Sequence, residues 1–253
     1  MNKSDFYAAE TYFWSSISKQ TYHPSAHAHC FLSPINTPFF NFLFLHQGAT
    51  EKGLIKAADF FNQAQQSYIT AIEESALSEA LQQAIKQQAL VFDCCTSAMG
   101  LILQQRAKLK FAPNADIRIE ANTNLLNWKQ PLASAFAIEG DAITSQYQAA
   151  HQSALDQHCQ FYHFVLFAQQ QAACALTLSI QGTVARLDDI GTQTKVQGKG
   201  YASRLIEEAL CFAQTKGVTH CYLDASNQGL SIYQKLGFKS LFQYHSYLHQ
   251  EAQ

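Results

Sequence analysis

Two glycines flank a lysine where an apolar segment gives way to an amphipathic one. Gly198 and Gly200 lie on either side of Lys199, and the residues from Tyr201 onward have helical spacing. Because glycine lacks a Cβ, main-chain N–H groups there can approach an anion closely. The first N–H groups of a helix are unpaired and lie at the positive end of its dipole. The junction predicts a phosphate- or diphosphate-binding turn, although the same glycines would suit a plain strand-to-helix turn.

Two common nucleotide-binding loops fit this turn poorly. A Walker A loop needs Ser or Thr after its Gly-Lys pair, and here Gly200 follows Lys199. A dinucleotide fingerprint has a third glycine, where this chain has Ser203, and it follows its strand directly, whereas a polar stretch precedes Gly198. Asp224 lies near the distance expected of a ribose-binding acid. A Rossmann-type oxidoreductase therefore stays open as a third, weaker alternative.

A different pattern fits the turn better. The segment Gln197-x-x-Gly200-x-Ala202 resembles the Gln/Arg-x-x-Gly-x-Gly/Ala signature of the GNAT superfamily of acyl-CoA-dependent N-acyltransferases. Downstream, residues 223–238 resemble the second motif of that family, with Tyr233-x-x-x-Gly237-Phe238 as its core. The two motifs have the order and the separation that the family uses, and the resemblance extends over residues 116–248.

Three residues depart from the commoner pattern of the family. Thr192 and Thr194 stand where Val and Pro are more frequent, and Ser226 stands where many members have Asn. These departures affect the contacts expected at each position more than the identification of the two motifs.

The resemblance implies a cosubstrate and the residues that hold it. The pantetheine arm of acetyl-CoA is expected to pair like an extra strand with the main chain of residues 190–192, and the diphosphate is expected on the N–H groups of residues 197–202. No metal is implied. The cofactor-binding residues implied in this way are Ile190, Gly191, Thr192, Gln197, Gly198, Lys199, Gly200, Tyr201, Ala202, Ser203, Ser226, Asn227 and Tyr233.

The implied reaction is direct attack of a neutral primary amine on the thioester, through a tetrahedral intermediate. A main-chain N–H near Thr192 would stabilise the oxyanion. Tyr233 occupies the position of a general acid for the departing thiolate, although it would also suit an apolar helix face. Asp188, Asp189 and Glu139 are candidate bases; each would also suit a solvated charge, and water is an alternative. A rival function is that of a non-catalytic acyl-CoA-binding sensor or scaffold.

Periodicity predicts the elements that position these residues. In the C-terminal half we expect, in order, strand 116–121, helices 125–136 and 145–158, strands 160–168, 172–180 and 183–190, a helix from 200 to 217, strand 219–223, helix 230–236 and strand 238–248. This is the element order of the family. The predicted fold class is α/β (α+β), with a mixed, mostly antiparallel twisted sheet flanked by helices.

The N-terminal half has a similar pattern without the glycine pair. We expect strand 39–46, a helix capped by Thr50, strand 68–72, a helix over 77–85 and a strand from 90 that extends to 95 or 103. Pro24, Pro34 and Pro38 argue against regular structure before residue 39. We place a domain boundary between residues 1–112 and 113–253, and interpret the first domain as a degenerate, GNAT-like copy that shapes the acceptor site or the edge of the fold.

Composition limits the partners and the location of the protein. Hydrophobic residues make up 47% of the 253 residues, charged residues make up 14% and the net charge is −2, so no basic nucleic-acid footprint is expected. No apolar run approaches the ~20 residues of a membrane span, and the N-terminus lacks a signal-peptide core. Seven cysteines without a Cys-x-x-Cys pair suit buried thiols in a reducing compartment. We expect a cytoplasmic protein that acts on a small-molecule or protein amine, with a homodimer left open.

Two further groups are weaker candidates. His23, His27, His29 and Cys30 have spacing that could suit a metal, but no second half-site accompanies them, which favours a surface cluster. The aromatic residues Phe242, Tyr244 and Tyr247 on the last predicted strand would suit either an acceptor pocket or the core.

Overall fold

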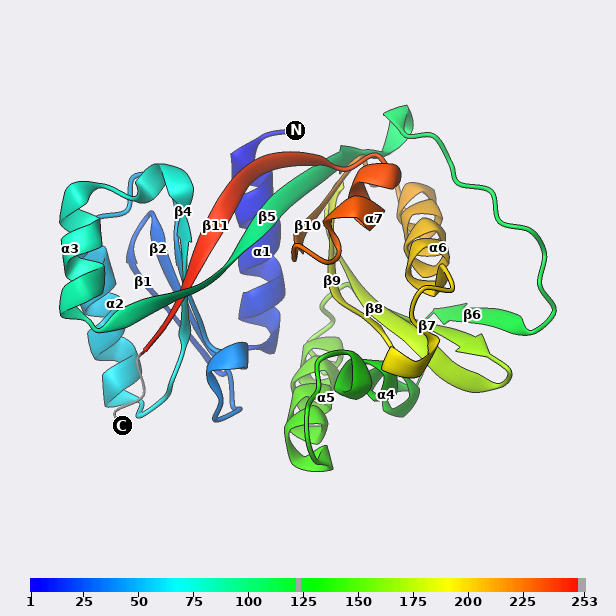
Figure 1. Ribbon diagram of the computed structural model, residues 1–253, viewed down its shortest axis with the longest axis horizontal. Coiled ribbons are helices and arrows are strands. Elements are labelled where there is room, and N and C mark those ends of the chain that lie inside the picture. The colour runs from blue at the N-terminus through cyan, green and yellow to red at the C-terminus, as the bar shows by residue number, and fades with distance from the viewer. Residues whose placement is uncertain (122–123, 250–253) are drawn as a thin grey trace.

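The computed structural model describes residues 1–121 and 124–249, which form one long sheet covered by helices on both faces (Figure 1). The helices are α1 Lys3–Ile17, α2 Glu51–Gln63, α3 Glu79–Gln87, α4 Leu125–Ala135, α5 Asp141–Asp156, α6 Tyr201–Thr215 and α7 Leu230–Lys235. The strands are β1 Gln20–Ser25, β2 Ala28–Leu32, β3 Phe42–Leu45, β4 Ile69–Glu73, β5 Leu90–Ile102, β6 Ile117–Ala121, β7 Phe161–Ala168, β8 Gln171–Gln181, β9 Val184–Thr192, β10 His220–Ala225 and β11 Lys239–His249.

The sheet joins the two halves of the chain through exchanged strands. Its order is β1-β2-β3-β4-β11-β5-β10-β9-β8-β7-β6. The pairs β3–β4 and β9–β10 are parallel, and each of the other neighbours is antiparallel, which confirms the predicted mixed, mostly antiparallel sheet. The last strand of the N-terminal half, β5, pairs with β10, and the last strand of the chain, β11, pairs with β4. The hydrogen-bonded sheet thus crosses the domain boundary placed at residue 112, and that boundary stays a prediction.

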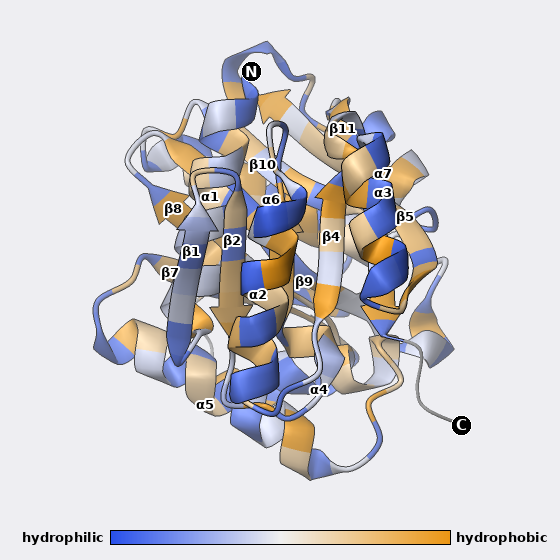
Figure 2. Cartoon of the chain, turned by 90° about the vertical axis from the view of Figure 1, so that its left-hand side faces the viewer, coloured by the Kyte–Doolittle hydropathy of each residue, from blue (hydrophilic) through white to orange (hydrophobic). Residues whose placement is uncertain are grey.

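Each half packs its own helices on the sheet. In Figure 2 the helix α2 lies over β1, β2 and β4, and it buries Leu54, Ala57 and Phe61 in the cluster beneath it. In the C-terminal half α6 buries Leu205, Ile206 and other residues against β7, β8 and β9. The helices α4 and α5 pack together over the same strands in a separate cluster that includes Trp128. The clusters under α2 and α6 are therefore separate, whereas the cluster that includes Trp128 and a fourth one around Phe6 contain residues of both halves.

The helix α1 corrects the expectation that residues before 39 lack regular structure. Its side chains contact β2, β8, β9 and α5, so it lies between the two halves of the sheet. The buried residues are Phe6, Ala9, Glu10, Phe13 and Ile17, a helical stripe that the neighbouring exposed and half-buried aromatic residues obscure in the sequence. This helix supplies contacts from the N-terminal half to the strand that carries the candidate bases.

The strands β1 and β2 correct the same expectation. Pro24 lies in β1, which is the outermost strand and pairs on one side alone. An edge strand tolerates proline because its outward N–H needs no partner. The proline signal was therefore correct about local hydrogen bonding and wrong about the absence of a strand.

The remaining predicted elements are found with small shifts at their ends. Thr50 caps α2 by accepting a hydrogen bond from the N–H of Gly53, and the strand from residue 90 extends to Ile102. α5 begins at Asp141 rather than 145, and β3 begins at Phe42 after a short 3-10 turn. Across the described part of the chain, no helix has the length and apolar character to span a bilayer.

Candidate active site

The glycine turn leads directly into the N-terminus of α6. Gly198 and Gly200 both have φ of +77°, a left-handed conformation that side-chain-bearing residues rarely adopt, and a Cβ added at either would meet nothing within 4 Å. The glycines are therefore required by backbone conformation and not by crowding. Within the described residues, no hydrogen bond is formed by the main-chain N–H groups of residues 198–203. A row of free donors at the start of a 15-residue helix fits a diphosphate.

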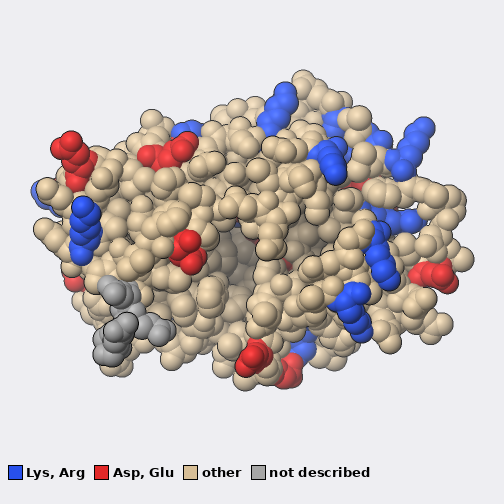
Figure 3. Space-filling view, in the orientation of Figure 1, with Lys and Arg blue, Asp and Glu red and all other residues tan. Residues whose placement is uncertain are grey.

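Side-chain hydrogen bonds fasten this turn to its surroundings. Gln197 Nε2 donates to the carbonyl oxygen of Thr192 at 3.2 Å, and Thr194 N donates to Ser134 Oγ of α4 at 3.1 Å. Lys199 and Tyr201 line a cavity of about 320 Å³ beside the turn, which also reaches β6 and β7. Lysine and arginine side chains gather over this half of the molecule in Figure 3. The turn is thus held in place and lies in a basic part of the surface.

The strands β9 and β10 separate at the centre of the sheet. Their register runs from Val184 opposite His220 to Arg186 opposite Tyr222 and ends there, although β9 continues to Thr192. The main chain of β9 beyond residue 186 consequently has no neighbouring strand on that side among the described residues. Residues 190–192, to which the pantetheine arm was assigned, lie on this open edge.

A bulge in β9 places two adjacent carboxylates near the open edge. The register with β8 shifts between Thr177, opposite Asp188, and Ala175, opposite Gly191, and Asp189 has a φ of +54°. A Cβ added at Gly191 would lie 2.9 Å from Leu132 Cδ2, so this glycine is required for close packing of α4. The assignment of Gly191 to acetyl-CoA stays a prediction.

Asp188 belongs to a buried ion cluster. Arg186 Nε donates to Asp188 Oδ1 at 3.0 Å and to Oδ2 at 3.1 Å, and Arg186 Nη2 donates to Asp224 Oδ2 at 2.5 Å. Burial raises the pKa of Asp188 to about 7, against the lowering effect of Arg186. Burial also disfavours the charge of Arg186, but Asp188 and Asp224 outweigh it and raise the pKa of the guanidinium. Because Asp224 is held by Arg186, it is not free to bind a ribose.

Asp189 lies in a different setting, toward α5. Tyr147 Oη donates to Asp189 Oδ1 at 2.7 Å, and Oδ2 lies 3.6 Å from His151 Nε2 with no hydrogen-bond partner in the described part of the chain. Burial raises the pKa of Asp189 to about 6, and the Tyr147 hydrogen bond opposes that rise. Burial, together with His163, lowers the pKa of His151 well below its ordinary value, so the imidazole is neutral near pH 7. Asp189 therefore forms no ion pair with a lysine or arginine in the described part of the chain, although Arg186 lowers its pKa from a distance, and its buried Oδ2 is left without a hydrogen bond.

Tyr233 lies on the opposite face of the sheet from Asp189. It is 8% exposed, packs in the cluster of α6 and α7, and its ring lies 6.1 Å from that of Phe238. A Cβ on Gly229 would come within 2.8 Å of the Tyr233 ring, so Gly229 makes room for it. Ser226 and Asn227 are exposed in the turn before α7. The catalytic role of Tyr233 and the cofactor contacts of Ser226 and Asn227 stay predictions.

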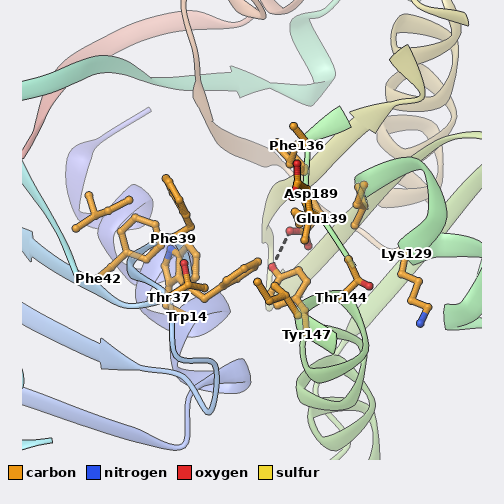
Figure 4. A pocket seen from close by; sticks show the side chains of 16 residues that line it. Trp14, Thr37, Phe39, Phe42, Lys129, Phe136, Glu139, Thr144, Tyr147 and Asp189 are labelled. Atoms are coloured by element: carbon orange, nitrogen blue, oxygen red, sulfur yellow. Dashed lines mark hydrogen bonds between the residues drawn. The ribbon is translucent and has the colours of Figure 1, made fainter. Parts of the chain in front are cut away.

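A larger cavity opens beside Asp189, between the two halves of the chain (Figure 4). Its volume is about 630 Å³. Residues of α4, α5 and the loop between them, including Glu139 and Tyr147, line it on one side. From the N-terminal half it is lined by Trp14, Thr37, Phe39, Phe40, Phe42 and Ile69. Phe242, Tyr244 and Tyr247 are not among the lining residues; Phe242 and Tyr244 are buried in a cluster with Phe6 of α1. The last strand thus supplies core side chains and not the wall of this cavity.

Several residues that line this cavity or lie beside Asp189 were not found from the sequence. Tyr147 and His151 lie four residues apart on the buried stripe of α5, beside Ala150 and Ala154. Polar side chains within an apolar helical stripe are a signal that could have singled them out. Trp14 and the segment 37–42 had no such signal, because their position depends on how the two halves meet.

The histidines near the N-terminus do not assemble a metal site. The rings of His23 and His29 lie 4.7 Å apart, and that of His29 lies 4.9 Å from His46. Within 1–121 and 124–249, no group of three or more His, Cys, Asp or Glu side chains has the arrangement needed to hold a metal ion.

Comparison with known proteins places this site in context. Residues 159–240 match the family model described as an acetyltransferase (GNAT) domain. A GCN5-related N-acetyltransferase from Kribbella flavida has a TM-score of 0.69 at 11% identity, and the match covers 98% of this chain and 96% of that one. A conserved protein of unknown function from Staphylococcus epidermidis has a TM-score of 0.65 at 12% identity, over 93% and 96% of the two chains.

A third solved structure bears on the two halves. A tandem GNAT protein from the clavulanic acid biosynthesis pathway has a TM-score of 0.60 at 12% identity, and the match covers 89% of this chain and 79% of that one. At such identities the likeness shows the fold, and it includes the N-terminal half. The predicted fold class is thereby confirmed, whereas the division into two domains and the interpretation of the first as a degenerate copy stay predictions. No curated protein sequence matches the chain.

Proposed function

We propose that this protein transfers an acetyl group from acetyl-CoA to a primary amine, since residues 159–240 match the GNAT acetyltransferase domain model. The observation that carries the proposal is the combination of a free-donor glycine turn with the separated strands β9 and β10. The turn suits the diphosphate, and the open edge of β9 suits the amide groups of pantetheine. Together they would direct the thioester toward the bulge that carries Asp188 and Asp189.

Asp189 is our candidate for the base. It lines the larger cavity and has one oxygen without a partner, whereas both oxygens of Asp188 accept hydrogen bonds from Arg186. An apolar cavity lowers the pKa of an amine and raises that of a carboxyl group, which brings the two values together and favours proton transfer. Asp188 then acts by holding Arg186 and the bulge in place.

The remaining roles belong to the main chain and to Tyr233. A main-chain N–H of β9 near Thr192, on the open edge, would donate to the thioester oxygen as negative charge develops. Tyr233 would protonate the departing thiolate from the other face of the sheet; burial raises the pKa of its phenol, which keeps it protonated near pH 7 but makes it a weak acid. Lys199 and Tyr201 would add contacts to the cosubstrate beside the turn.

Thiol release from acetyl-CoA tests the proposed reaction. Purified protein is incubated with acetyl-CoA and a panel of amines, and free thiol is measured together with the acetylated amine. We expect amine-dependent release and thermal stabilisation by acetyl-CoA but not by NAD, because a ligand that binds the native state alone raises its stability. Stabilisation without release for any amine would favour the rival function, a sensor or scaffold that binds acyl-CoA. If neither acetyl-CoA nor NAD raises the stability, both the transfer reaction and the sensor or scaffold function are contradicted.

A further inference from the structure

The larger cavity carries an inference about the acceptor that rests on the proposed transfer reaction. We propose that it binds a primary amine with a compact apolar body, such as an aryl or branched alkyl group, whose nitrogen faces Asp189. Figure 4 shows Asp189 on the same wall as Tyr147, opposite the wall that carries Trp14 and Phe42. The cavity shares no lining residue with the one beside the glycine turn. The amine and the diphosphate would therefore bind at separate places along β9.

Aromatic side chains form much of both walls. The rings of Trp14 and Phe42 lie 4.4 Å apart, and those of Phe40 and Tyr147 lie 4.6 Å apart across the two halves of the chain. Phe39 and Phe136, which are 62% and 55% exposed, also line the cavity, one from each half. Packed aromatic walls and a volume of about 630 Å³ suit a small ligand that buries a ring or a branched chain.

The charges of the cavity favour a cation. Lys129 lines it, but its ammonium group donates to Asp141 at 2.7 Å and to Ser145 at 2.9 Å. Neither Asp189 nor Glu139 is paired with a lysine or arginine in the described part of the chain. The two carboxylates would attract an ammonium group and repel a carboxylate. The aromatic faces add cation–π attraction for the same group.

The polar groups of the cavity are too few for a sugar. The hydroxyl groups on its walls belong to Thr37, Thr144 and Tyr147; the last two already donate to Asp141 and Asp189. Each substrate hydroxyl left unpaired in such a place weakens binding by about tenfold or more. An amino sugar or a polyamine would therefore be a poor acceptor.

Relative acceptor activity tests this inference. The rate of thiol release is measured for phenethylamine, isoamylamine, ethanolamine, glucosamine and spermidine at one pH and one acetyl-CoA concentration. Burial of a phenyl or isobutyl group predicts a kcat/KM for the first two that is about 10- to 100-fold above that of ethanolamine. A kcat/KM for glucosamine or spermidine above that for phenethylamine would overturn the inference about the acceptor, but it would still support the transfer reaction.

A binding measurement separates this inference from the proposed function. Calorimetry compares phenethylamine with hydrocinnamate, its carboxylate counterpart of similar size. We expect binding of the amine and at least tenfold weaker binding of the acid. If the amine binds but is not acetylated, the transfer reaction fails while the ligand class holds. If phenethylamine and hydrocinnamate bind equally, or if neither binds, the proposed ligand class is contradicted whether or not the amine is acetylated.

Two substitutions localise the binding to this cavity. Phe42→Ala should lower kcat/KM for phenethylamine at least tenfold through KM, with little change for methylamine, which does not reach the aromatic wall. Phe92→Ala is the matched control, because Phe92 is 51% exposed on β5 and does not line the cavity. Glu139→Gln, in an exposed loop, should reduce the preference for phenethylamine over hydrocinnamate. Equal effects of Phe42→Ala and Phe92→Ala would place the acceptor elsewhere.

Discussion

Each half of the sheet contains a strand that leads through a short connection to a helix and then to a parallel strand. The polar groups of this arrangement differ between the two halves. In the C-terminal half, β9 leads through residues 193–200 to α6 and runs parallel to β10; in the N-terminal half, β3 leads through residues 46–50 to α2 and runs parallel to β4. The first connection contains two left-handed glycines and free N–H groups. In the second, the Thr50 side chain accepts from Gly53 N, and β3 and β4 remain paired through Leu45 and Ile72.

Two buried carboxylates, one in each half, show the same contrast. Glu73, at the end of β4, is buried and accepts hydrogen bonds from Lys3, Tyr7, Ser75 and the N–H of Gln47. Asp189 in β9 accepts one from Tyr147 and has no cationic partner in the described part of the chain. The carboxylate of Glu73 is thus satisfied within the N-terminal half, while the C-terminal half keeps main-chain donors and one oxygen of Asp189 without hydrogen bonds. The same strand and helix arrangement can therefore bind a ligand only where its polar groups have no hydrogen-bond partner within the protein.

The largest expected effect comes from neutralising one carboxylate in each half. Asp189→Asn should lower kcat/KM about 10²- to 10⁴-fold, the range typical of a lost general base, while acetyl-CoA affinity is kept. Glu73→Gln, at a buried carboxylate of the N-terminal half, should leave the rate per folded molecule unchanged. Steady-state kinetics with calorimetric titration of acetyl-CoA measures both. A comparable rate loss in the two variants, or full activity in Asp189→Asn, would contradict the assignment of the base.

The glycine turn can be tested with a control that shares its geometry. Gly198→Ala with Gly200→Ala forces two residues into a left-handed conformation that costs about 1–2 kcal/mol each, so the turn should rearrange and weaken acetyl-CoA binding at least tenfold. Gly182→Ala also imposes a positive φ with open space around the new Cβ, but in the β8–β9 turn at the far end of β9. Its affinity for acetyl-CoA, measured by calorimetry, should match that of the unaltered protein. Equal weakening in both would mean that the turn is not the diphosphate site.

The stability of the two carboxylate variants should depend on pH in opposite ways. The pKa of Asp189 is raised to about 6 by burial, so its contribution to stability is full below the pKa of the unfolded chain and is lost as pH rises through 6. Although burial opposes it, hydrogen bonds from Lys3, Ser75 and Tyr7 hold the pKa of Glu73 below its ordinary value. The contribution of Glu73 to stability is therefore present above the pKa that it has in the unfolded chain, and it is lost as pH falls through its lower folded-state pKa.

Urea denaturation at pH 8 and pH 5 measures this difference. At pH 8, Asp189→Asn should be more stable than the unaltered protein by about 1–3 kcal/mol, because it removes an ionised buried carboxylate, and the gain should shrink at pH 5. Glu73→Gln should be less stable at pH 8. Destabilisation by both substitutions at pH 8 would show that Asp189 is a structural carboxylate like Glu73.

The sequence predicted the C-terminal half because its signals are local. The glycine pair and the helix that follows are contiguous, and so are Tyr233 and the turn before α7. The exchange of β5 and β11 between the halves has no local signal, because a strand's residues do not encode which neighbour it pairs with. The larger cavity was missed for the same reason, since Trp14 and Tyr147 are brought together by tertiary packing. Local chemistry was thus predictable, and the meeting of distant segments was not.

The smallest expected effect concerns Tyr233, which has no tyrosine counterpart in α3, the helix that follows β4. A thiol has a pKa near ~8.5, so its thiolate leaves with little need of protonation, and the loss of the phenol should cost less than the ~10²-fold typical of a general acid. We expect Tyr233→Phe to lower kcat about tenfold with unchanged acetyl-CoA affinity. Tyr68→Phe, a buried tyrosine of the N-terminal half, is the control and should leave kcat unaltered. If Tyr233→Phe keeps the full kcat, water and not Tyr233 protonates the thiolate. The glycine turn and Asp189 would then be the features that distinguish the C-terminal half chemically from the N-terminal half.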